Sequence, residues 1–571
     1  MSKELIKTSL EKSKGIKDDY VYLADWCKVP KNKKNDIIDY PISADQLLGL
    51  NEEIDKVSKI LLSQLTKTYN KNLQINENEI YYKIILGKWL NHFVNNVYEK
   101  MILLKNVKDL HPNISTKIGK SFFEESFNSY SYYVKAFSSQ KFHYNFFSSI
   151  LNINKDFKKI VFDIPVIRLK RKSKKIFFHR IRENFRYYLG EFFLIINKTL
   201  RNNYTLVVNP YYSKDYLFNA IWFFIKSKGK IVHYDFKKNK SNIKINKELR
   251  NKFSFSKIEN GNKLLNISSK LLFKYIPLCY LEQFLELREI SKKWHLKNSK
   301  CKGFFTANAI QNEEQFKYTV AFNQKIPLST IQHGNGYGSD KILSSEDYEV
   351  SLSENFYTWG WGKLKLAHPK LNFNEKSNYL KKSRILFTLP SMGFYSGALD
   401  TQNLYFIKRE NITDDSNQFI KNLTIPLKQN IYKRELSDTF LREMKLESKM
   451  KDDTFKNFHK SLYYSRIHVT NHFGTPFLES LSMGIPTILF LNNFEDYLRS
   501  DVLNLFKQMK SVNIIFDDPI LASDHINKYY DCINTWWMSE STQAVLRKFT
   551  ARFCYSSSNW REKWLKELTN D

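Results

Sequence analysis

The chain has 571 residues, 42% of them hydrophobic and 15% aromatic, a composition that excludes an intrinsically disordered protein and provides material for several domains. The 90 Lys and Arg residues outnumber the 58 Asp and Glu residues, so the net charge is +32. This charge favours an acidic partner such as a nucleotide, an anionic lipid headgroup, a phosphorylated glycan or nucleic acid. Lys, Asn and Ile are abundant throughout, as an AT-rich genome would produce, so compositional drift remains an alternative explanation.

The cysteines and the N-terminus bear on the compartment. Five scattered cysteines, none in a CxxC pair, exclude a disulfide framework and favour a reducing environment. The N-terminal residues lack the apolar core of a signal peptide, and no run of about 18 apolar residues marks a membrane span. We expect a cytoplasmic protein, and a peripheral contact with the inner face of the cytoplasmic membrane stays open.

Residues 20–26 are expected to form a short strand or a buried turn. Helical apolar spacing follows at residues 52–69 and 81–104, and we expect residues 1–150 to form a helical region packed on the first domain. A dense basic run with two aromatic residues follows at 168–180. Such a run is most often a solvated loop, but it can also track a nucleic-acid strand or lie on an anionic membrane surface. No zinc-finger, RRM or bZIP motif accompanies it, which disfavours nucleic acid.

Strands and helices then alternate. A strand at 205–210, a helix at 214–225 and a strand at 230–236 form one βαβ unit, and a second unit covers 303–332. This alternation predicts a parallel sheet covered by helices on both faces, a Rossmann-like domain over residues 151–365.

The second unit ends in QHGNGYG, with His333 where the strand ends and Gln332, Gly334, Gly336 and Gly338 around it. Open α/β sheets bind ligands at this edge. An imidazole with a pKa near 6.5 could take a proton from an acceptor hydroxyl there.

Asp340, or Glu346 or Asp347 further along, could orient the imidazole of His333 or serve as the base itself. The simpler alternative is a plain glycine turn in which the histidine bonds only the backbone.

A polar, proline-containing stretch at 366–383 is the predicted linker to a second α/β domain at 384–535. Its first strand runs into a turn that holds Ser391 and Gly393, which would lie near the ligand if the sheet has the usual order. The remaining residues, 536–571, are predicted to be C-terminal helices.

The stretch HVTNHFGTPFLESLSMGIPTILFL, residues 468–491, predicts a strand, a glycine turn, a helix and a strand. Amide groups at the start of such a helix attract phosphate, which makes Gly474 and Thr475 candidates for donor binding. Glu479 lies one helical turn beyond Thr475, where a carboxylate could reach a ribose diol. The order of these residues resembles the nucleotide-sugar site of GT-B glycosyltransferases. An ordinary βαβ unit whose glycines only turn the chain is the alternative.

Several motifs spread over the chain resemble one family. They are ADWC near Cys27, ILGKWL, TANAIQNEEQFK, QHGNGYG, FYTWGWG, TPFLESLSMGIPTILF and YSSSNWREKWL. The family consists of transferases encoded in bacterial lipopolysaccharide and surface-carbohydrate loci, first noticed in leptospires. The resemblance implies a cytoplasmic sugar transferase acting in O-antigen or related glycan assembly.

One departure from that family affects the donor site. The family usually has serine or threonine after the Asn of its T-x-N turn, whereas this chain has His472 and Phe473. His472 could stack on or bond the donor, or it could simply fill the turn.

These observations predict an α/β, GT-B-like fold with two Rossmann-like domains facing across a cleft, a helical N-terminal extension and a crossing C-terminal helix. Trp560 and Trp564 would form the buried face of that helix. We expect a glycosyltransferase that moves a sugar from a nucleotide-activated donor to a hydroxyl of a glycan or lipid-linked acceptor. No convincing DxD-like metal site is present, so we expect no bound metal or other cofactor.

Other functions stay open on the same sequence. A nucleotide-sugar epimerase uses the same pair of domains, and a polyol-phosphate transferase uses a similar HG turn. A non-enzymatic alternative is a basic scaffold on membrane or nucleic acid. The sequence does not distinguish donor sugar, acceptor, stereochemistry or oligomeric state.

Overall fold

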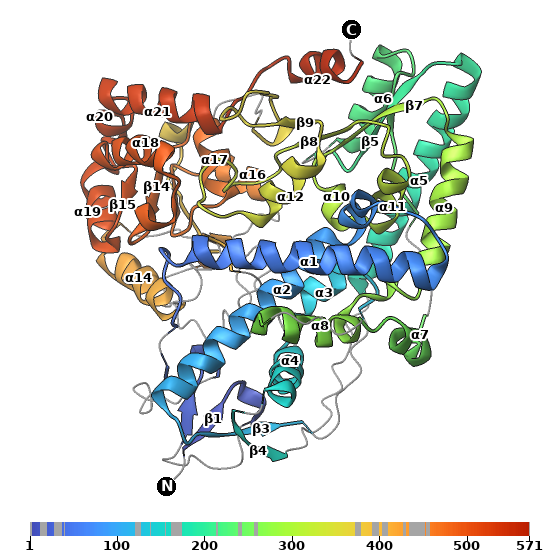
Figure 1. Ribbon diagram of the computed structural model, residues 1–571. Helices are drawn as coiled ribbons and strands as arrows, with labels where there is room; N and C mark the ends of the chain where they lie inside the picture. Colours follow the sequence, from blue (N-terminus) through green and yellow to red (C-terminus); the bar gives the residue numbers. More distant parts are fainter. Residues whose placement is uncertain are drawn as a thin grey trace.

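A computed structural model gives the arrangement of the chain (Figure 1). It describes residues 3–11, 20–27, 37–38, 40–119, 127–137, 139–154, 156–161, 174–212, 215–237, 243–255, 261–371, 378–390, 399–401, 409–425, 430–432, 451–452 and 457–569. The side chains of 174–183, 409–411, 430–432 and 451–452 are not described. The basic run at 168–180 and the predicted turn residues Ser391 and Gly393 therefore lie outside the described side chains.

The first domain contains a five-stranded parallel sheet in the order β6-β5-β7-β8-β9. Its strands are β5 (Tyr204–Val208), β6 (Ile231–His233), β7 (Cys301–Thr306), β8 (Leu328–Ile331) and β9 (Asn355–Tyr357). The helices of this part are α5 (Lys174–Leu200), α6 (Tyr216–Lys226), α7 (Lys247–Lys252), α8 (Lys263–Tyr275), α9 (Phe284–Lys297), α10 (Ala309–Asn312), α11 (Glu314–Phe322) and α12 (Ser344–Leu352). Both predicted βαβ units are present in this sheet.

The second domain contains a six-stranded parallel sheet in the order β12-β11-β10-β13-β14-β15. Its strands are β10 (Ile385–Thr388), β11 (Asn430–Tyr432), β12 (Lys451–Asp452), β13 (Ile467–Thr470), β14 (Thr487–Phe490) and β15 (Ile515–Phe516). Its helices are α14 (Arg409–Asn422), α16 (Phe458–Tyr463), α17 (Thr475–Ser482), α18 (Ser500–Ser511), α19 (Pro519–Tyr529), α20 (Ile533–Trp537) and α21 (Glu540–Phe553). Strand β13, the glycine turn, α17 and β14 reproduce the unit predicted for residues 468–491.

The N-terminal region combines helices with a third parallel sheet, in the order β2-β1-β3-β4. Its strands are β1 (Glu4–Ile6), β2 (Tyr20–Tyr22), β3 (Ser115–Ile118) and β4 (Lys158–Val161), and its helices are α1 (Leu47–Leu73), α2 (Glu79–Leu110), α3 (Tyr130–Ala136) and α4 (Gln140–Ile153). The sequence predicted a helical region with one short strand or buried turn at residues 20–26, where β2 lies, and did not predict the other three strands. Strands of three or four residues are too short to show a period of two, so periodicity could not reveal this sheet.

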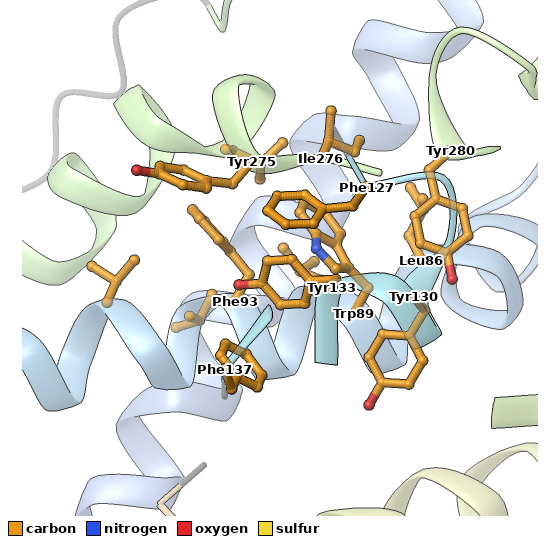
Figure 2. Close-up of a cluster of buried hydrophobic side chains, with 14 of the residues drawn as sticks. Leu86, Trp89, Phe93, Phe127, Tyr130, Tyr133, Phe137, Tyr275, Ile276 and Tyr280 are labelled. Carbon is orange, nitrogen blue, oxygen red and sulfur yellow. The ribbon is translucent and has the colours of Figure 1, made fainter. Parts of the chain in front are cut away.

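Helix α2 joins the small sheet to the first domain. Apolar residues cover nearly its whole circumference, and it contacts α1, α4, α8, α11 and α12. One continuous hydrophobic core consequently runs from Leu5 in β1 to Leu328 in β8. Figure 2 shows the aromatic part of this core, where the indole of Trp89 lies 5.5 Å from the ring of Phe93 and 6.2 Å from that of Tyr133.

The last helix, α22 (Trp560–Thr569), returns from the second domain to the first, where it lies near α6 in Figure 1. The predicted buried pair is confirmed, since Trp560 is 6% and Trp564 0% exposed. The indole N–H of Trp564 donates to the carbonyl of Ala367 (2.8 Å), and the Thr205 hydroxyl donates to the carbonyl of Leu568 (2.9 Å). The C-terminal helix thus ties the two halves together, as predicted.

Candidate active site

The two strand-end turns predicted from the sequence contact each other directly. The amide N–H of Asn335, after β8, donates to Oγ1 of Thr475 (3.2 Å), and its side-chain amide donates to the carbonyl of Phe473 (2.9 Å). A Cβ placed on Gly334 would stand 3.7 Å from Oγ1 of Thr475. The carboxyl ends of the two sheets therefore face each other, with one turn from each domain at the junction.

Each turn also lies close to the point where its sheet reverses strand order. In the first sheet β5 is flanked by β6 and β7, and in the second β10 is flanked by β11 and β13. Tyr211, which follows β5, has its ring 5.8 Å from that of His333, which follows β8. In open α/β sheets ligands bind outside the carboxyl ends of the strands at such reversal points. The positions of both turns fit a shared ligand site.

The turn at residues 332–338 has a fixed shape. The side chain of Gln332 donates to the carbonyl of Gly334 (2.9 Å) and accepts the indole N–H of Trp361 (2.8 Å). Gly336 and Gly338 have φ values of +91° and +70°, and a Cβ on Gly338 would stand 2.2 Å from Cδ2 of Trp361. Only glycine fits at Gly338, because any side chain would need a strained backbone and would collide with the indole.

The imidazole of His333 lies beside the buried side chains of Tyr337 and Glu349. Its Nδ1 is 3.2 Å from the hydroxyl of Tyr337 and 3.6 Å from Oε1 of Glu349, and its side chain is 19% exposed. Burial, together with the charges of Lys370 and Lys88, lowers the pKa of His333 to about 3, and a hydrogen bond to the Ala307 carbonyl acts in the opposite direction. The imidazole is therefore neutral near pH 7.

Glu349 is the carboxylate that contacts His333. It is fully buried, and it accepts hydrogen bonds from the hydroxyl of Tyr337 (2.9 Å) and the side-chain amide of Gln311 (2.5 Å). Burial raises the pKa of Glu349 to about 8, although these two hydrogen bonds and the charge of Lys88 act in the opposite direction. With these pKa values the imidazole of His333 is neutral near pH 7, and Glu349 becomes a carboxylate only as the pH rises through about 8.

Lys88 extends this buried network into α2. Its ammonium donates to the hydroxyls of Ser344 (3.0 Å) and Ser345 (3.2 Å), and only 2% of the residue is exposed. Burial lowers the pKa of Lys88 to about 8, while the charge of Glu349 raises it. The N-terminal region thus contributes a cation to the surroundings of His333.

Glu349, Tyr337 and Lys88 were not predicted from the sequence. Helix α12 carries Glu346, Asp347 and Glu349 within four residues. No clear apolar face on this helix indicates which carboxylate points inward, so only the three-dimensional contacts could single out Glu349.

The carboxylates that were predicted lie elsewhere. Asp340 is buried and forms an antiparallel bridge with Leu498 of the second domain, and its carbonyl accepts from Nε of Arg499 (2.8 Å). Glu346 accepts from the guanidinium of Arg499 (2.8 Å) and from the amide of Gly338 (2.9 Å). Asp340 and Glu346 therefore lie at the junction of the domains, and the described contact with His333 comes from Glu349. A catalytic role for Asp340 stays a prediction.

The second turn places His472 beside the start of α17. Nδ1 of His472 lies 2.9 Å from the hydroxyl of Thr470, and a Cβ on Gly474 would stand 2.7 Å from the imidazole. Gly474 donates to the carbonyl of His472 (3.0 Å), Phe477 donates to that of Gly474 (3.0 Å), and Pro476 has no N–H. The predicted phosphate site therefore rests on the Thr475 amide and the helix dipole rather than on a full set of amides.

Glu479 is buried in α17, with 3% exposure. Its Oε2 lies 3.3 Å from Nε2 of His459 in α16, a pairing that the sequence did not predict. The donor-binding roles of His472, Gly474, Thr475 and Glu479 stay predictions. Within the described part of the chain, no group of three or more His, Cys, Asp or Glu side chains could hold a metal ion.

Two parallel α/β domains whose strand ends meet, joined by a C-terminal helix that crosses back to the first, form the GT-B architecture predicted from the sequence. Residues 3–568 match the model of the LIC12162 family transferases. The chain belongs to that family and is a transferase, which confirms the family resemblance seen in the motifs. No curated protein matches it in sequence.

Solved structures with remote similarity include MurG from Acinetobacter baumannii, at 9% identity and a TM-score of 0.33, covering 64% of this chain and 100% of that one. The wall teichoic acid polymerase TagF gives 10% identity and a TM-score of 0.32, with 69% and 97% covered. A variant of Thermobaculum terrenum O-GlcNAc transferase gives 9% and 0.35, with 92% and 97% covered.

Proposed function

We propose that this transferase moves a sugar from a nucleotide-activated donor to a hydroxyl of a glycan or lipid-linked acceptor. The observation that carries the proposal is the direct contact between the turn holding His333 and the turn that opens α17. One turn offers a neutral imidazole and the other a helix start suited to an anion, so a donor and an acceptor could meet between them.

In the proposed reaction the acceptor oxygen bonds to the anomeric carbon of the donor sugar. The bond from that carbon to the phosphate oxygen breaks, and the nucleotide leaves with the electron pair. The proton of the acceptor hydroxyl goes to His333. The helix start at Gly474 and Thr475 would hold the leaving phosphate, and Glu479 the ribose. A histidine base suits inversion of the anomeric configuration.

Glu349 would act through His333 as a positioning residue. An imidazole that takes a proton becomes a cation, and the carboxylate form of Glu349, 3.6 Å away, would lower its energy. This form grows as the pH rises through about 8. Tyr337 donates to Glu349 and lies beside the same nitrogen of His333, so it would fix the orientation of both groups.

The family resemblance extends the proposal to surface polysaccharide, with O-antigen or related lipopolysaccharide as the product and the cytoplasmic face of the membrane as the place of action. Within the described residues no helix is both long and apolar enough to span a bilayer. We further propose that no bound metal or other cofactor is needed, since helix starts and basic side chains can stabilise a leaving phosphate.

Product analysis tests the reaction type. The purified protein is incubated with nucleotide sugars and lipid-linked or oligosaccharide acceptors, and the products are identified by mass spectrometry and ³¹P NMR. We expect a free nucleotide together with a glycosidic product, both absent for His333→Ala. A free isomerised sugar would instead indicate an epimerase, and CMP with a phosphodiester product would indicate a polyol-phosphate transferase.

A further inference from the structure

Two helices of the first domain present apolar side chains to solvent. On α5 the exposed residues lie at intervals of three and four, so they form one stripe, and α6 carries a similar set. The eight residues, each 38% to 66% exposed, are Phe185, Tyr188, Phe192, Ile195, Leu217, Phe218, Ile221 and Ile225. The solvent-facing side of a surface helix is normally polar. The solvent-facing sides of α5 and α6 are instead apolar.

Three contacts connect α5 with α6 and with the turn that follows α6. The guanidinium of Arg186 stands 4.0 Å over the ring of Tyr216, the rings of Phe193 and Phe224 stack at 4.4 Å, and the Asn197 amide donates to the carbonyl of Gly229 (2.7 Å). Residue numbers rise together on both sides of these contacts, so α5 and α6 run in the same direction. The two exposed stripes therefore belong to the same part of the first domain, and we call these eight residues together the α5–α6 surface.

Basic residues border the α5–α6 surface. Lys198 and Arg201 are exposed at the end of α5, and Lys226 and Lys228 at the end of α6. On the other side the guanidinium of Arg561, in α22, stands 5.2 Å from the ring of Phe218. Helix α5 itself begins at Lys174, inside the basic run that the sequence analysis singled out.

Two acidic residues among the described side chains of this region have partners. Glu191 accepts the hydroxyl of Tyr234 (2.7 Å), and Asp235 pairs with Arg186 (3.5 Å). Asp215, before α6, is exposed. The edge of the surface is therefore positively charged, in line with the +32 charge of the whole chain.

We propose that the α5–α6 surface docks the protein on a bilayer that contains anionic phospholipids. Exposed aromatic and aliphatic side chains next to Lys and Arg are the combination that binds an anionic membrane interface, where the apolar side chains enter the acyl boundary. A protein partner or a second copy fits less well, because lysine is depleted at protein–protein interfaces. The proposal goes beyond the proposed reaction and would place the domain that holds His333 at the membrane surface.

Vesicle sedimentation tests this docking. The full-length protein is mixed with phosphatidylcholine vesicles with or without about one-third phosphatidylglycerol, an order-of-magnitude choice that gives a strongly negative surface. The test variant is F192Q/I195Q/F218Q/I225Q. The control is L296Q/L521Q, which changes exposed leucines on α9 and α19. Thermal unfolding of both variants confirms that they fold.

We expect the wild-type protein and the control to bind anionic vesicles, and binding to fall with salt. The test variant should bind at least about tenfold more weakly, since each buried Phe or Ile side chain is worth roughly tenfold or more. Failure of the wild-type protein to bind, equal binding to neutral vesicles, or unchanged binding of the test variant would overturn the proposal. So would a wild-type dimer in sedimentation velocity that the test variant abolishes. Nucleotide binding, measured separately, reports on the donor site whatever the vesicles show.

Discussion

The Glu349–His333 pair is where the chemistry can be tested at the scale of a single residue. Glu349→Gln keeps the size of the side chain but removes the carboxylate, formed as the pH rises through about 8, that would stabilise a protonated His333. At pH 9 we expect kcat to fall about 100-fold with little change in KM, within the range that a general base contributes. Steady-state kinetics on the identified substrates measures it. Asp347→Asn, on the same helix, is the matched control and should keep its activity.

The pH dependence of kcat gives a second test of the Glu349–His333 pair. Burial raises the pKa of Glu349 to about 8, so its carboxylate form grows as the pH rises through that value. We expect wild-type kcat to increase from pH 7 to 9 and Glu349→Gln to lack this step. An identical pH profile in both proteins would mean that Glu349 has only a structural role.

At the residue scale the sequence predicted which residues lie in the two turns, but it did not predict which side chains contact His333. His333, Gly334, Gly474 and Thr475 were singled out because glycine turns follow apolar runs, and the structure brings these turns into contact. The partners of His333 could not be predicted, because they come from α12 and α2, whose packing around the turn depends on the whole fold.

At the scale of elements, the turn at residues 332–338 can be tested with two glycines. Gly338→Ala places a Cβ where the indole of Trp361 stands, at a φ of +70°, whereas Gly334→Ala meets only the Thr475 hydroxyl at 3.7 Å. We expect Gly338→Ala to lower the free energy of unfolding by about 3 kcal/mol, from strain and overpacking together. Chemical denaturation measures it. Gly334→Ala should stay within about 0.5 kcal/mol of wild type.

Element prediction succeeded where patterns were long and failed where they were short. The β13–α17–β14 unit and the two βαβ units of the first domain have clear apolar periodicity and strong turn residues. Three strands of the N-terminal sheet, β1, β3 and β4, were missed because each has only three or four residues, and β1 and β3 are more than 100 residues apart in sequence. Pairing over such a distance leaves no local pattern.

At the scale of the whole molecule, buried histidines make the fold sensitive to acid. Burial lowers the pKa of His233, His333, His368 and His468 to about 3 each. Unfolding restores ordinary values near 6.5, so the unfolded chain binds more protons between pH 6.5 and 3. The stability that these groups provide is present above pH 6.5 and is lost as the pH falls below it.

Each such histidine changes the free energy of unfolding by about 1.4 kcal/mol per pH unit within that window. Glu349, whose pKa is raised to about 8, has the opposite effect, because the folded protein binds its proton more tightly than the unfolded chain does. It offsets the contribution of about one histidine in this window. We therefore expect Tm to drop steeply from pH 6.5 to pH 5, and His368→Gln to show a shallower slope. A Tm that stays flat between pH 6.5 and 5 would contradict the buried neutral state of these side chains.

The two-domain architecture was predictable because strand and helix patterns alternate along the sequence of a parallel α/β domain. The crossing helix was predictable because Trp560 and Trp564 lie on one helix face. The shared core between the N-terminal region and the first domain was not predictable in detail. It depends on α2, whose apolar residues surround the helix and point to no single neighbour.

The most direct test of the account is nucleotide binding at the α17 turn. Thermal shifts are measured for the wild-type protein and Glu479→Gln with UDP, GDP, dTDP, ADP, CDP and CMP. A ligand at 100 times its dissociation constant stabilises by about 2.7 kcal/mol, which a melting curve resolves. We predict that one nucleotide raises the wild-type Tm and that Glu479→Gln loses most of the shift. No response to any nucleotide, or an equal shift in both proteins, would contradict the donor site proposed here.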